Sequence, residues 1–393
     1  MIWTASYPPV LGGLQTVTQQ LAHGLSDRGH EVVVLTNRYP KHLPEFEVSN
    51  KVKVFRVLHA RPNPTDNSVR GYVSFLKNKL RFQQSQNKIT KIIKDFNPDI
   101  INIHFPDSQI PYWSEVKKWV KCKLVVSTHG HEILKWFRQD NEVVLDSQKT
   151  INSIQKRIKN ELTGFLSDAD AITACSGWML QKTVDLIGSN NSMTAKIVTY
   201  NTVDTERFLG KESGSRAKPQ YIFSFGRLAS HKGFDLLISA FSEIKKRQVY
   251  PLRLIIGGDG DEQKKLKDLI QHFGLESDVI LTGRLSPEEV VAYLQDAELI
   301  VIPSKREPFG ISVIESLCSA NSVVATNIGG IPEAAGSLAI LCDPSTPSLI
   351  NGIEKGLRQK VTDSQMEERR KHLLQFSMES FLNRYEKALF LQS

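Results

Sequence analysis

Short apolar runs alternate with helix-like stretches along most of the chain, and this alternation limits the fold more than any other feature. Six runs in the first half are rich in β-branched residues and almost continuously apolar. They cover residues 31–36, 52–57, 99–104, 123–128, 171–176 and 196–200. Helical stretches lie between several of them, for example at residues 16–28 and 71–96. Such strands are typical of a parallel sheet that is covered on both faces.

The same order returns in the second half, after a polar segment at residues 209–220 that has the composition of a linker. Five apolar runs, "YIFSFG", "LRLIIGG", "VILTG", "LIVIPS" and "SVVATN", are separated there by helical stretches. At 393 residues the chain exceeds the length at which a single core stops growing. We therefore predict an α/β protein of two doubly wound domains.

The net charge lies in one half of the chain. Residues 1–205 hold 26 Lys and Arg against 18 Asp and Glu, whereas residues 206–393 hold 24 of each kind. We therefore expect the first half to meet an anionic partner.

Cysteine usage and apolar content favour a cytoplasmic protein. The four cysteines, Cys122, Cys175, Cys318 and Cys342, show no CxxC spacing, which favours reduced thiols over a structural zinc. No run of eighteen apolar residues is present, and the first residues lack the basic and apolar regions of a secretory signal. We expect neither a membrane span nor secretion.

Open parallel sheets bind ligands at the carboxyl ends of their strands, so the residues after each strand are candidates for a site. The first candidates are Gly12 and Gly13, which directly precede a helical stretch. Free N–H groups and the positive helix end would face an anion there. The alternative is a tight turn that needs glycine for a positive φ. The absence of a GxGxxG fingerprint argues against a nicotinamide dinucleotide.

Arg227 and Lys232 flank the exit of the first strand in the second half. Two cations at such a place could clamp a diphosphate, with Arg bidentate and Lys a point charge. The alternative is a solvated loop with two surface charges.

Glu307 and Glu315 follow the run "LIVIP", the first in a loop and the second in a helical stretch that begins near Gly310. An ionised carboxylate only accepts hydrogen bonds, and a diol offers two O–H donors. One glutamate could therefore hold the ribose of a nucleotide and the other the hydroxyls of a sugar. The N–H groups of Gly310 and Ile311 would meet phosphate.

Over essentially its whole length the chain resembles the retaining glycosyltransferases of family four. The resemblance is carried by "YPPVLGG…LAHGLSDRGHEVVVLT", "FGRLASHKGFDLLISAF", the loop "GGDG" and "EPFGISVIESLCSANSVVATNIGGIPE". It implies catalytic roles for His129, Arg227, Lys232 and Glu307. The residues assigned to donor binding are Gly12, Gly13, Arg227, Lys232, Glu307, Phe309, Gly310, Ile311 and Glu315.

The resemblance also implies the GT-B fold, in which two Rossmann-like domains face a cleft. Residues 1–205 would hold the acceptor, residues 206–375 the nucleotide sugar, and the helix at 376–393 would cross back to the first domain. The implied reaction moves a sugar, with retention, from a UDP- or GDP-sugar to a hydroxyl of a glycan or lipid-linked acceptor, such as a glycolipid or polysaccharide precursor. We expect no cofactor and no nucleic acid. Relatives often read Asn-Gly-Val-Asp where this chain has Thr202 in place of glycine.

Three motifs resemble metal sites. "HGHE" at residues 129–132 lacks the helical i, i+4 histidine spacing and an evident third ligand, so a buried structural histidine is the stronger alternative for His129. "DAD" at 168–170 precedes a strand and lies at the wrong end of the sheet, and "DGD" at 259–261 resembles an acidic loop of the family. We predict that the reaction needs no metal.

Two other functions remain open. A nucleotide-sugar 2-epimerase of the same fold would bind the same donor and transfer nothing, and a catalytically silent subunit would bind it without turnover. Detection of a new glycoside separates both from a transferase.

Basic and apolar side chains are interleaved in two stretches of the first half. The first holds Trp113, Lys117, Lys118, Trp119, Lys121 and Lys123, and the second holds Phe75, Leu76, Lys77, Lys79, Leu80, Arg81, Phe82, Lys88, Lys91 and Lys94. They are either solvated helices that pack their apolar residues inward, or a face that rests on anionic lipid while rings enter the interface. The second interpretation would suit a lipid-linked acceptor and a peripheral location on the inner face of the plasma membrane.

Overall fold

The computed structural model describes residues 1–10, 12–59, 69–137, 148–188, 194–205, 207, 220–247, 252–319 and 321–390. The chain divides into two compact units. The first comprises Met1–Cys175, Met179–Thr199 and Leu382–Ser393, and the second comprises Ser176–Trp178 and Tyr200–Phe381. The predicted linker lies outside the described residues, except for Gln220.

An eight-stranded sheet forms the centre of the first unit, as far as its residues are described, in the order β3-β4-β2-β1-β5-β6-β7-β8. The strands are β1 (Ile2–Thr4), β2 (Val33–Asn37), β3 (Phe46–Ser49), β4 (Val52–Val57), β5 (Ile100–His104), β6 (Lys123–Thr128), β7 (Ala171–Ala174) and β8 (Ala195–Val198). All neighbours are parallel except β3, which pairs antiparallel with β4 at one edge. Leu35, Ile103 and Val126 are fully buried, which explains the continuous apolar runs of these strands.

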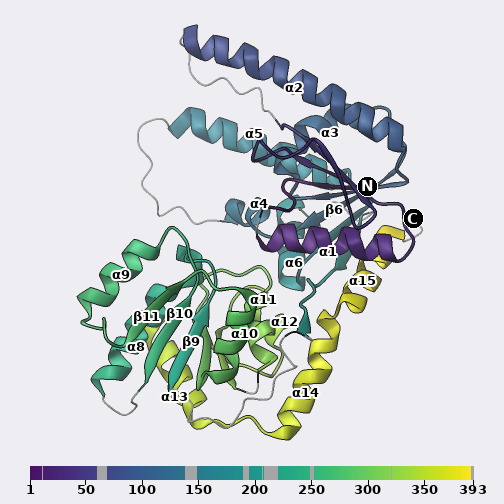
Figure 1. The fold of residues 1–393 in the computed structure, drawn as a ribbon. Helices are drawn as coiled ribbons and strands as arrows, with labels where there is room; N and C mark the ends of the chain where they lie inside the picture. Colours follow the sequence, from purple (N-terminus) through teal and green to yellow (C-terminus); the bar gives the residue numbers. More distant parts are fainter. Residues whose placement is uncertain are drawn as a thin grey trace. The chain divides into compact units, whose positions relative to one another are not determined.

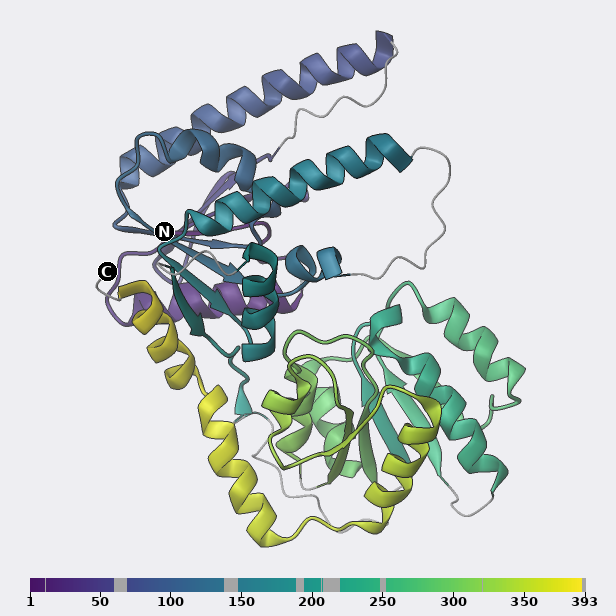
Figure 2. The same ribbon diagram turned by 180° about the vertical axis from the view of Figure 1, so that it is seen from behind.

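Helices cover both faces of this sheet, with α2, α3 and α5 on one face and α1, α6 and α15 on the other (Figures 1 and 2). Their bounds, with those of two 3-10 turns and the short α4, are α1 (Gly13–Asp27), α2 (Val69–Phe96), η1 (Pro106–Ser108), α3 (Ile110–Val116), α4 (His131–Leu134), η2 (Lys135–Phe137), α5 (Gln148–Ser167), α6 (Gly177–Ile187) and α15 (Met378–Phe390). α1 and α15 meet where Arg28 Nη1 lies 2.6 Å from Glu386 Oε2. The division between the units falls within α6 and α15.

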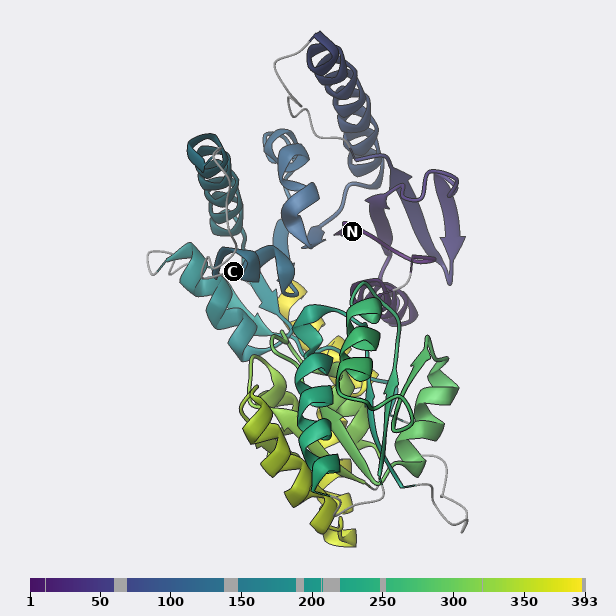
Figure 3. The same ribbon diagram turned by 90° about the vertical axis from the view of Figure 1, so that its left-hand side faces the viewer.

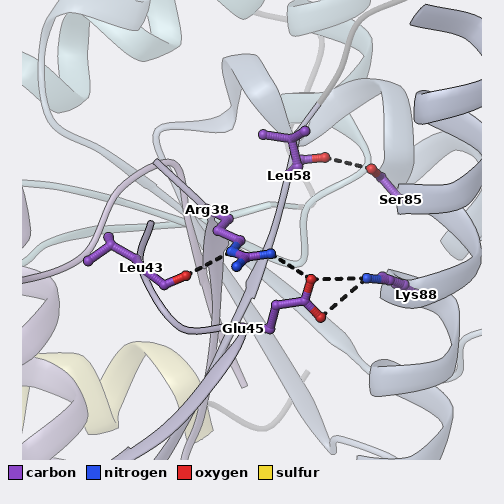
Figure 4. Close-up of polar contacts among 6 residues, drawn as sticks. All are labelled: Arg38, Leu43, Glu45, Leu58, Ser85 and Lys88. Atoms are coloured by element: carbon purple, nitrogen blue, oxygen red, sulfur yellow. Dashed lines mark hydrogen bonds and ion pairs between the residues drawn. The ribbon is translucent and has the colours of Figure 1, made fainter. Parts of the chain in front are cut away.

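Polar contacts attach the C-terminal half of α2 to the β2–β4 edge of the sheet (Figure 4). The Glu45 carboxylate accepts hydrogen bonds from Arg38 Nη1 at 2.7 Å and from Lys88 Nζ at 3.3 Å. Ser85 Oγ donates to the carbonyl of Leu58 at 2.5 Å. The N-terminal half of α2 extends past the sheet (Figures 1 and 3).

A six-stranded, entirely parallel sheet forms the described centre of the second unit, in the order β11-β10-β9-β12-β13-β14. The strands are β9 (Tyr221–Phe225), β10 (Arg253–Gly257), β11 (Val279–Gly283), β12 (Leu299–Ile302), β13 (Ser322–Thr326) and β14 (Ile340–Cys342). The order reverses between β9 and β12. Their carboxyl ends therefore flank the crevice where ligands bind in open sheets.

Helices also cover both faces of the second sheet. They are η3 (Ser230–Lys232), α8 (Phe234–Lys246), α9 (Gln263–His272), α10 (Pro287–Asp296), α11 (Ile311–Leu317), α12 (Ile331–Ala335), α13 (Thr346–Arg358), α14 (Asp363–Leu373) and η4 (Leu374–Phe376). α8, α9 and α13 share a core with one sheet face, including Phe241 and Ile353, which are both fully buried. On the other face, Phe223 of β9 stacks on Tyr293 of α10 with ring centroids 5.1 Å apart.

The two doubly wound sheets confirm the predicted fold class. Two strands were not predicted from the sequence: β3, an edge strand with Phe46 and Val48 exposed, and the three-residue β14. β3 lacks the continuous apolar pattern of a buried central strand, whereas β14 is short but lies within the apolar run at residues 338–342. The helix predicted at 16–28 begins earlier, at Gly13.

Candidate functional site

The loop between β12 and α11 carries Glu307 and packs its main chain against a glycine pair. The N–H of Gly330 donates to the carbonyl of Glu307 at 3.0 Å, and Gly329 has φ of +61°. A Cβ on Gly329 would lie 1.9 Å from that carbonyl oxygen, and one on Gly330 would lie 2.4 Å from the carbonyl oxygen of Pro308. The sequence "NIGGIPE" therefore needs both glycines for a close approach of two main-chain segments.

A second loop, after β9, brings Lys232 to Glu307. The carbonyl of His231 accepts the N–H of Lys305 at 2.8 Å, and a Cβ on Gly233, whose φ is +70°, would lie 2.0 Å from the carbonyl oxygen of Pro303. This packing leaves Lys232 Nζ 2.5 Å from Glu307 Oε2. The two side chains are 21% and 12% exposed, so the ion pair is largely shielded from water.

Glu315 lies one turn inside α11, and its carboxylate makes no hydrogen bond to another described residue. Burial raises the pKa of its carboxyl to about 7, and the charge of Lys232 opposes this rise. The N–H groups of Gly310 and Ile311, where α11 begins, are likewise unbonded within the described ranges. A partly buried carboxylate without a donor is unfavourable unless a ligand supplies one, and this marks a candidate site.

Arg227 lies in a loop that packs against the "GGDG" loop. The N–H of Leu228 donates to the carbonyl of Asp259 at 2.9 Å, and a Cβ on Gly258 would lie 1.9 Å from the carbonyl oxygen of Gly226. Arg227 itself is 70% exposed, with Nη2 3.7 Å from Oδ2 of the 91% exposed Asp261. Such an exposed pair contributes little, so the guanidinium is available to an anion.

Phe309, one of the expected donor-binding residues, is 2% exposed. Its ring stacks on Tyr200 at a centroid distance of 5.6 Å and meets the edge of Phe376 at 5.7 Å. Any contact between Phe309 and a donor would therefore come from its main chain, because the ring belongs to the core.

The remaining predicted site residues lie in the first unit. His129 follows β6, with Nε2 2.9 Å from Nδ1 of His104, and burial lowers its pKa to about 4. The carboxylate of Glu132 accepts the main-chain N–H of His129 at 2.5 Å. Asn102 and His104, which share one face of the buried strand β5, were not predicted as site residues from the sequence. That period-two polar pattern within an apolar run was the available signal.

Gly12 and Gly13 are exposed at the start of α1, and neither has a φ in the left-handed range. The tight-turn explanation for this pair is therefore wrong. An added Cβ on Gly13 would meet no atom within 4 Å. Likewise, Thr202 has no positive φ, so the main chain there does not need a glycine.

Within the described ranges, no group of three or more His, Cys, Asp or Glu side chains could hold a metal ion. In "DAD", Asp168 Oδ2 lies 2.7 Å from Lys117 Nζ, and Asp170 Oδ2 accepts the N–H of Leu124 at 2.7 Å. In "DGD", Asp259 Oδ1 accepts the N–H of Gly260 at 2.7 Å. These carboxylates have protein partners.

The proposed aromatic anchors of the first unit are largely packed inward. Trp113 is 6% exposed and meets the ring of Phe165 edge-on, and Phe82 stacks on Tyr112. The prediction that Trp113 could enter a lipid interface is therefore wrong. Leu80 of α2 is 66% exposed, whereas the side chains of Phe75 and Leu76 lie outside the described residues. No described helix is long and apolar enough to cross a membrane.

Two doubly wound units, the second with a glutamate pair and two cations at its strand exits, define a glycosyltransferase of the GT-B fold. The chain belongs to glycosyltransferase family 4. The model of "Glycosyltransferase Family 4" matches residues 11–207, and that of "Glycosyl transferases group 1" matches residues 206–373.

Individual relatives agree with this assignment. The mannosylfructose-phosphate synthase of Agrobacterium fabrum is 27% identical over 87% of this chain and 78% of its own length. Among solved structures, sucrose-phosphate synthase from Thermosynechococcus elongatus matches with a TM-score of 0.75 at 17% identity, over 98% of this chain and 97% of that one. Anabaena Alr3699/HepE in complex with UDP matches with a TM-score of 0.69 at 20% identity, over 99% and 98% of the two chains.

Proposed function

We propose that the protein transfers a sugar, with retention of anomeric configuration and without a metal ion, from a nucleoside diphosphate sugar to a hydroxyl acceptor. The observation that carries the proposal is the cluster at the carboxyl ends of β9 and β12, where Glu315 has no described partner and Lys232 pairs with Glu307. Support for a nucleoside diphosphate sugar as donor comes from the Anabaena protein, whose structures were solved with UDP and with UDP-glucose.

The donor's diphosphate would be bound by cations and main-chain N–H groups of the second unit. Arg227 is exposed, and Lys232 has a carboxylate partner that a phosphate could replace. The free N–H groups of Gly310 and Ile311 would add donors to the same anion. Together they would stabilise the charge that develops on the leaving diphosphate.

The two glutamates would divide the hydroxyl groups of the donor. Glu315 lacks a described donor, so it would accept both hydroxyls of the ribose diol. Glu307 would accept hydroxyls of the sugar that is transferred, while its charge favours an oxocarbenium-like state. The acceptor hydroxyl would attack C1 on the face that the diphosphate leaves while the bond from C1 to the diphosphate breaks. It would pass its proton to the departing phosphate oxygen, which gives retention without a covalent intermediate.

The first unit would bind the acceptor, a glycan or a lipid-linked precursor. Lys77, Lys79, Leu80 and Arg81 form an exposed patch on α2 that suits an anionic surface. His129 would contact a substrate hydroxyl.

The test is a screen of UDP- and GDP-sugars for thermal stabilisation, because a ligand of the folded state raises its midpoint. Donors that stabilise are then incubated with simple glycoside acceptors, and the product is examined by NMR for its anomeric configuration. A new glycoside with the donor's configuration supports the proposal. A donor epimerised at C2 would indicate an epimerase, and stabilisation without turnover would indicate a silent subunit.

A further inference from the structure

A chain of polar side chains leads from His129 into the first unit's sheet. His129 Nε2 lies 2.9 Å from Nδ1 of His104, whose Nε2 lies 2.6 Å from Oδ1 of Asn102. Asn102 Nδ2 in turn donates to the main-chain carbonyl of Val125 at 3.2 Å and to Ser127 Oγ at 2.9 Å. Asn102 and His104 are 1% and 0% exposed.

The direction of each hydrogen bond follows from the carbonyl at the end of this chain. A main-chain carbonyl only accepts, so the side-chain NH₂ of Asn102 must face Val125 and its Oδ1 must face His104. Oδ1 also only accepts, so the proton of His104 is on Nε2. In a neutral His104 the Nδ1 atom is then an acceptor, and His129 must donate to it from Nε2. The remaining nitrogen of His129, Nδ1, carries a bare lone pair.

Burial favours the neutral form of both rings. Burial lowers the pKa of His104 well below its ordinary value, and the neighbouring His129 lowers it further. No carboxylate of the described residues forms an ion pair with either ring. His129 Nδ1 makes no hydrogen bond within the described part of the chain, so its lone pair is free for a ligand.

We propose that His104 is a positioning residue that holds His129 in its Nε2–H tautomer, so that Nδ1 accepts a hydrogen bond from a neutral hydroxyl group of the substrate. This inference rests on the proposed function for the identity of that substrate. A bare nitrogen repels the oxygens of a phosphate or carboxylate and attracts an O–H donor. His129 therefore binds a hydroxyl group of the sugar or of the acceptor, whereas Arg227 and Lys232 bind anionic groups.

The tautomer can be measured without any substrate. In protein labelled with ¹⁵N-histidine, long-range ¹H–¹⁵N correlation spectra distinguish bare from protonated ring nitrogens. Loss of signals in His129→Gln and His104→Asn assigns the two rings. We expect an unprotonated Nδ1 in both rings over a range of about one pH unit on either side of neutral. A protonated Nδ1 on His129 overturns the proposal.

Three variants then test the positioning role. His104→Leu removes the acceptor for His129 Nε2, and kcat/KM should fall about tenfold, the scale of one buried hydrogen bond. His104→Asn places an amide oxygen near the position of Nδ1, so it should restore much of the activity and the wild-type tautomer. Ile103→Val, on the opposite face of β5, is a control for lost packing.

The outcomes separate this inference from the proposed function. If His104→Leu and His104→Asn lose activity equally while Tm falls as in Ile103→Val, His104 has a structural role only and the inference fails. Should His104→Leu not fold, His104→Asn and the wild-type spectra still decide the tautomer. If no nucleotide sugar is turned over by the wild type, the proposed function fails, whereas the spectra still test the tautomer.

Discussion

Lys232 Nζ lies 2.5 Å from Glu307 Oε2, although the two residues are 75 positions apart. Nothing in the sequence near either residue predicts that the two side chains meet. The contact depends on two loops whose main chains touch at Gly233 and Pro303. Each partner compensates the other's charge, and in the proposed function the phosphates and hydroxyls of a donor would take over that role.

A double-mutant cycle measures this pair. Lys232→Met leaves Glu307 shielded from water without its cation, and the free energy of unfolding should fall by about 1–3 kcal/mol. Glu307→Gln in the same chain should recover part of that loss, because an amide needs no cation. Urea unfolding of the wild type, both single variants and the double variant gives the coupling. Strictly additive losses would show that the pair carries no energy.

Arg227→Ala should reduce kcat/KM by about ten- to a hundredfold, since it removes one charge-assisted hydrogen bond of about 1.5–3 kcal/mol. The unfolding midpoint should not change, because the side chain is 70% exposed and its pair with Asp261 is long. Arg253→Ala is the matched control, because Arg253 is also exposed and begins β10 at the opposite end of the same sheet. Equal kinetics for the two variants would contradict the diphosphate role.

The affinity for a nucleotide should depend on the protonation of Glu315. Burial raises the pKa of this carboxyl to about 7, so below that pH a growing fraction is protonated and offers one acceptor less to a diol. We expect binding to weaken by up to about tenfold for each pH unit below 7. Calorimetric titration with the donor's nucleoside diphosphate at several pH values checks this. A Glu315→Gln variant should lose the dependence, whereas Glu276→Gln, which changes an exposed residue, should keep it.

The same pKa predicts a pH-dependent stability of the unliganded protein. The folded-state pKa is raised from the ordinary 4.5, so the folded state binds the proton more tightly than the unfolded state does. The contribution of Glu315 to stability is therefore greatest below 4.5 and is lost as the pH rises to about 7. Glu315→Gln should melt above the wild type at pH 8 and close to it at pH 4.5. A higher wild-type Tm at pH 8 would refute the assignment.

Activity should survive chelation. EDTA should leave the rate within about twofold of the untreated enzyme, because cations and main-chain N–H groups take the role of a metal ion. Assays with EDTA, and after addition of magnesium or manganese, test this. If EDTA abolishes activity and either metal restores it, the prediction is wrong and the carboxylates of "DAD" and "DGD" become candidate metal ligands.

Binding to anionic vesicles tests the exposed patch on α2. Each basic residue near such a surface contributes about 1 kcal/mol, so Lys77, Lys79 and Arg81 would hold the protein weakly and reversibly. Co-sedimentation at low salt should disappear when all three become Glu. The control makes the same charge change at Lys264, Lys265 and Lys267 of α9. Wild type that stays in the supernatant at low salt would favour an acceptor free in solution.

The fold and the candidate residues followed from the sequence because both depend on local patterns. Runs such as "EVVVLT" indicate buried parallel strands, and strand exits identify Glu307 and Lys232. The contact between those two residues could not be predicted, because it depends on main-chain packing at Gly233 and Gly329. The inward orientation of Phe309 and Trp113 could not be predicted either. The sequence around an aromatic residue does not tell whether its ring lines a site or packs in the core.

The glycine pair beneath Glu307 has a consequence for altering the sugar that the protein accepts. The main chain at Glu307 lies where it does because Gly329 and Gly330 have no side chains, and any Cβ there would collide with a carbonyl oxygen. A library aimed at new donors should therefore hold both glycines fixed and vary only the side chains that reach the sugar. Substitutions at either glycine would displace the Glu307 carboxylate whatever the donor. A selection would therefore score them as inactive variants and not as variants with a changed donor preference.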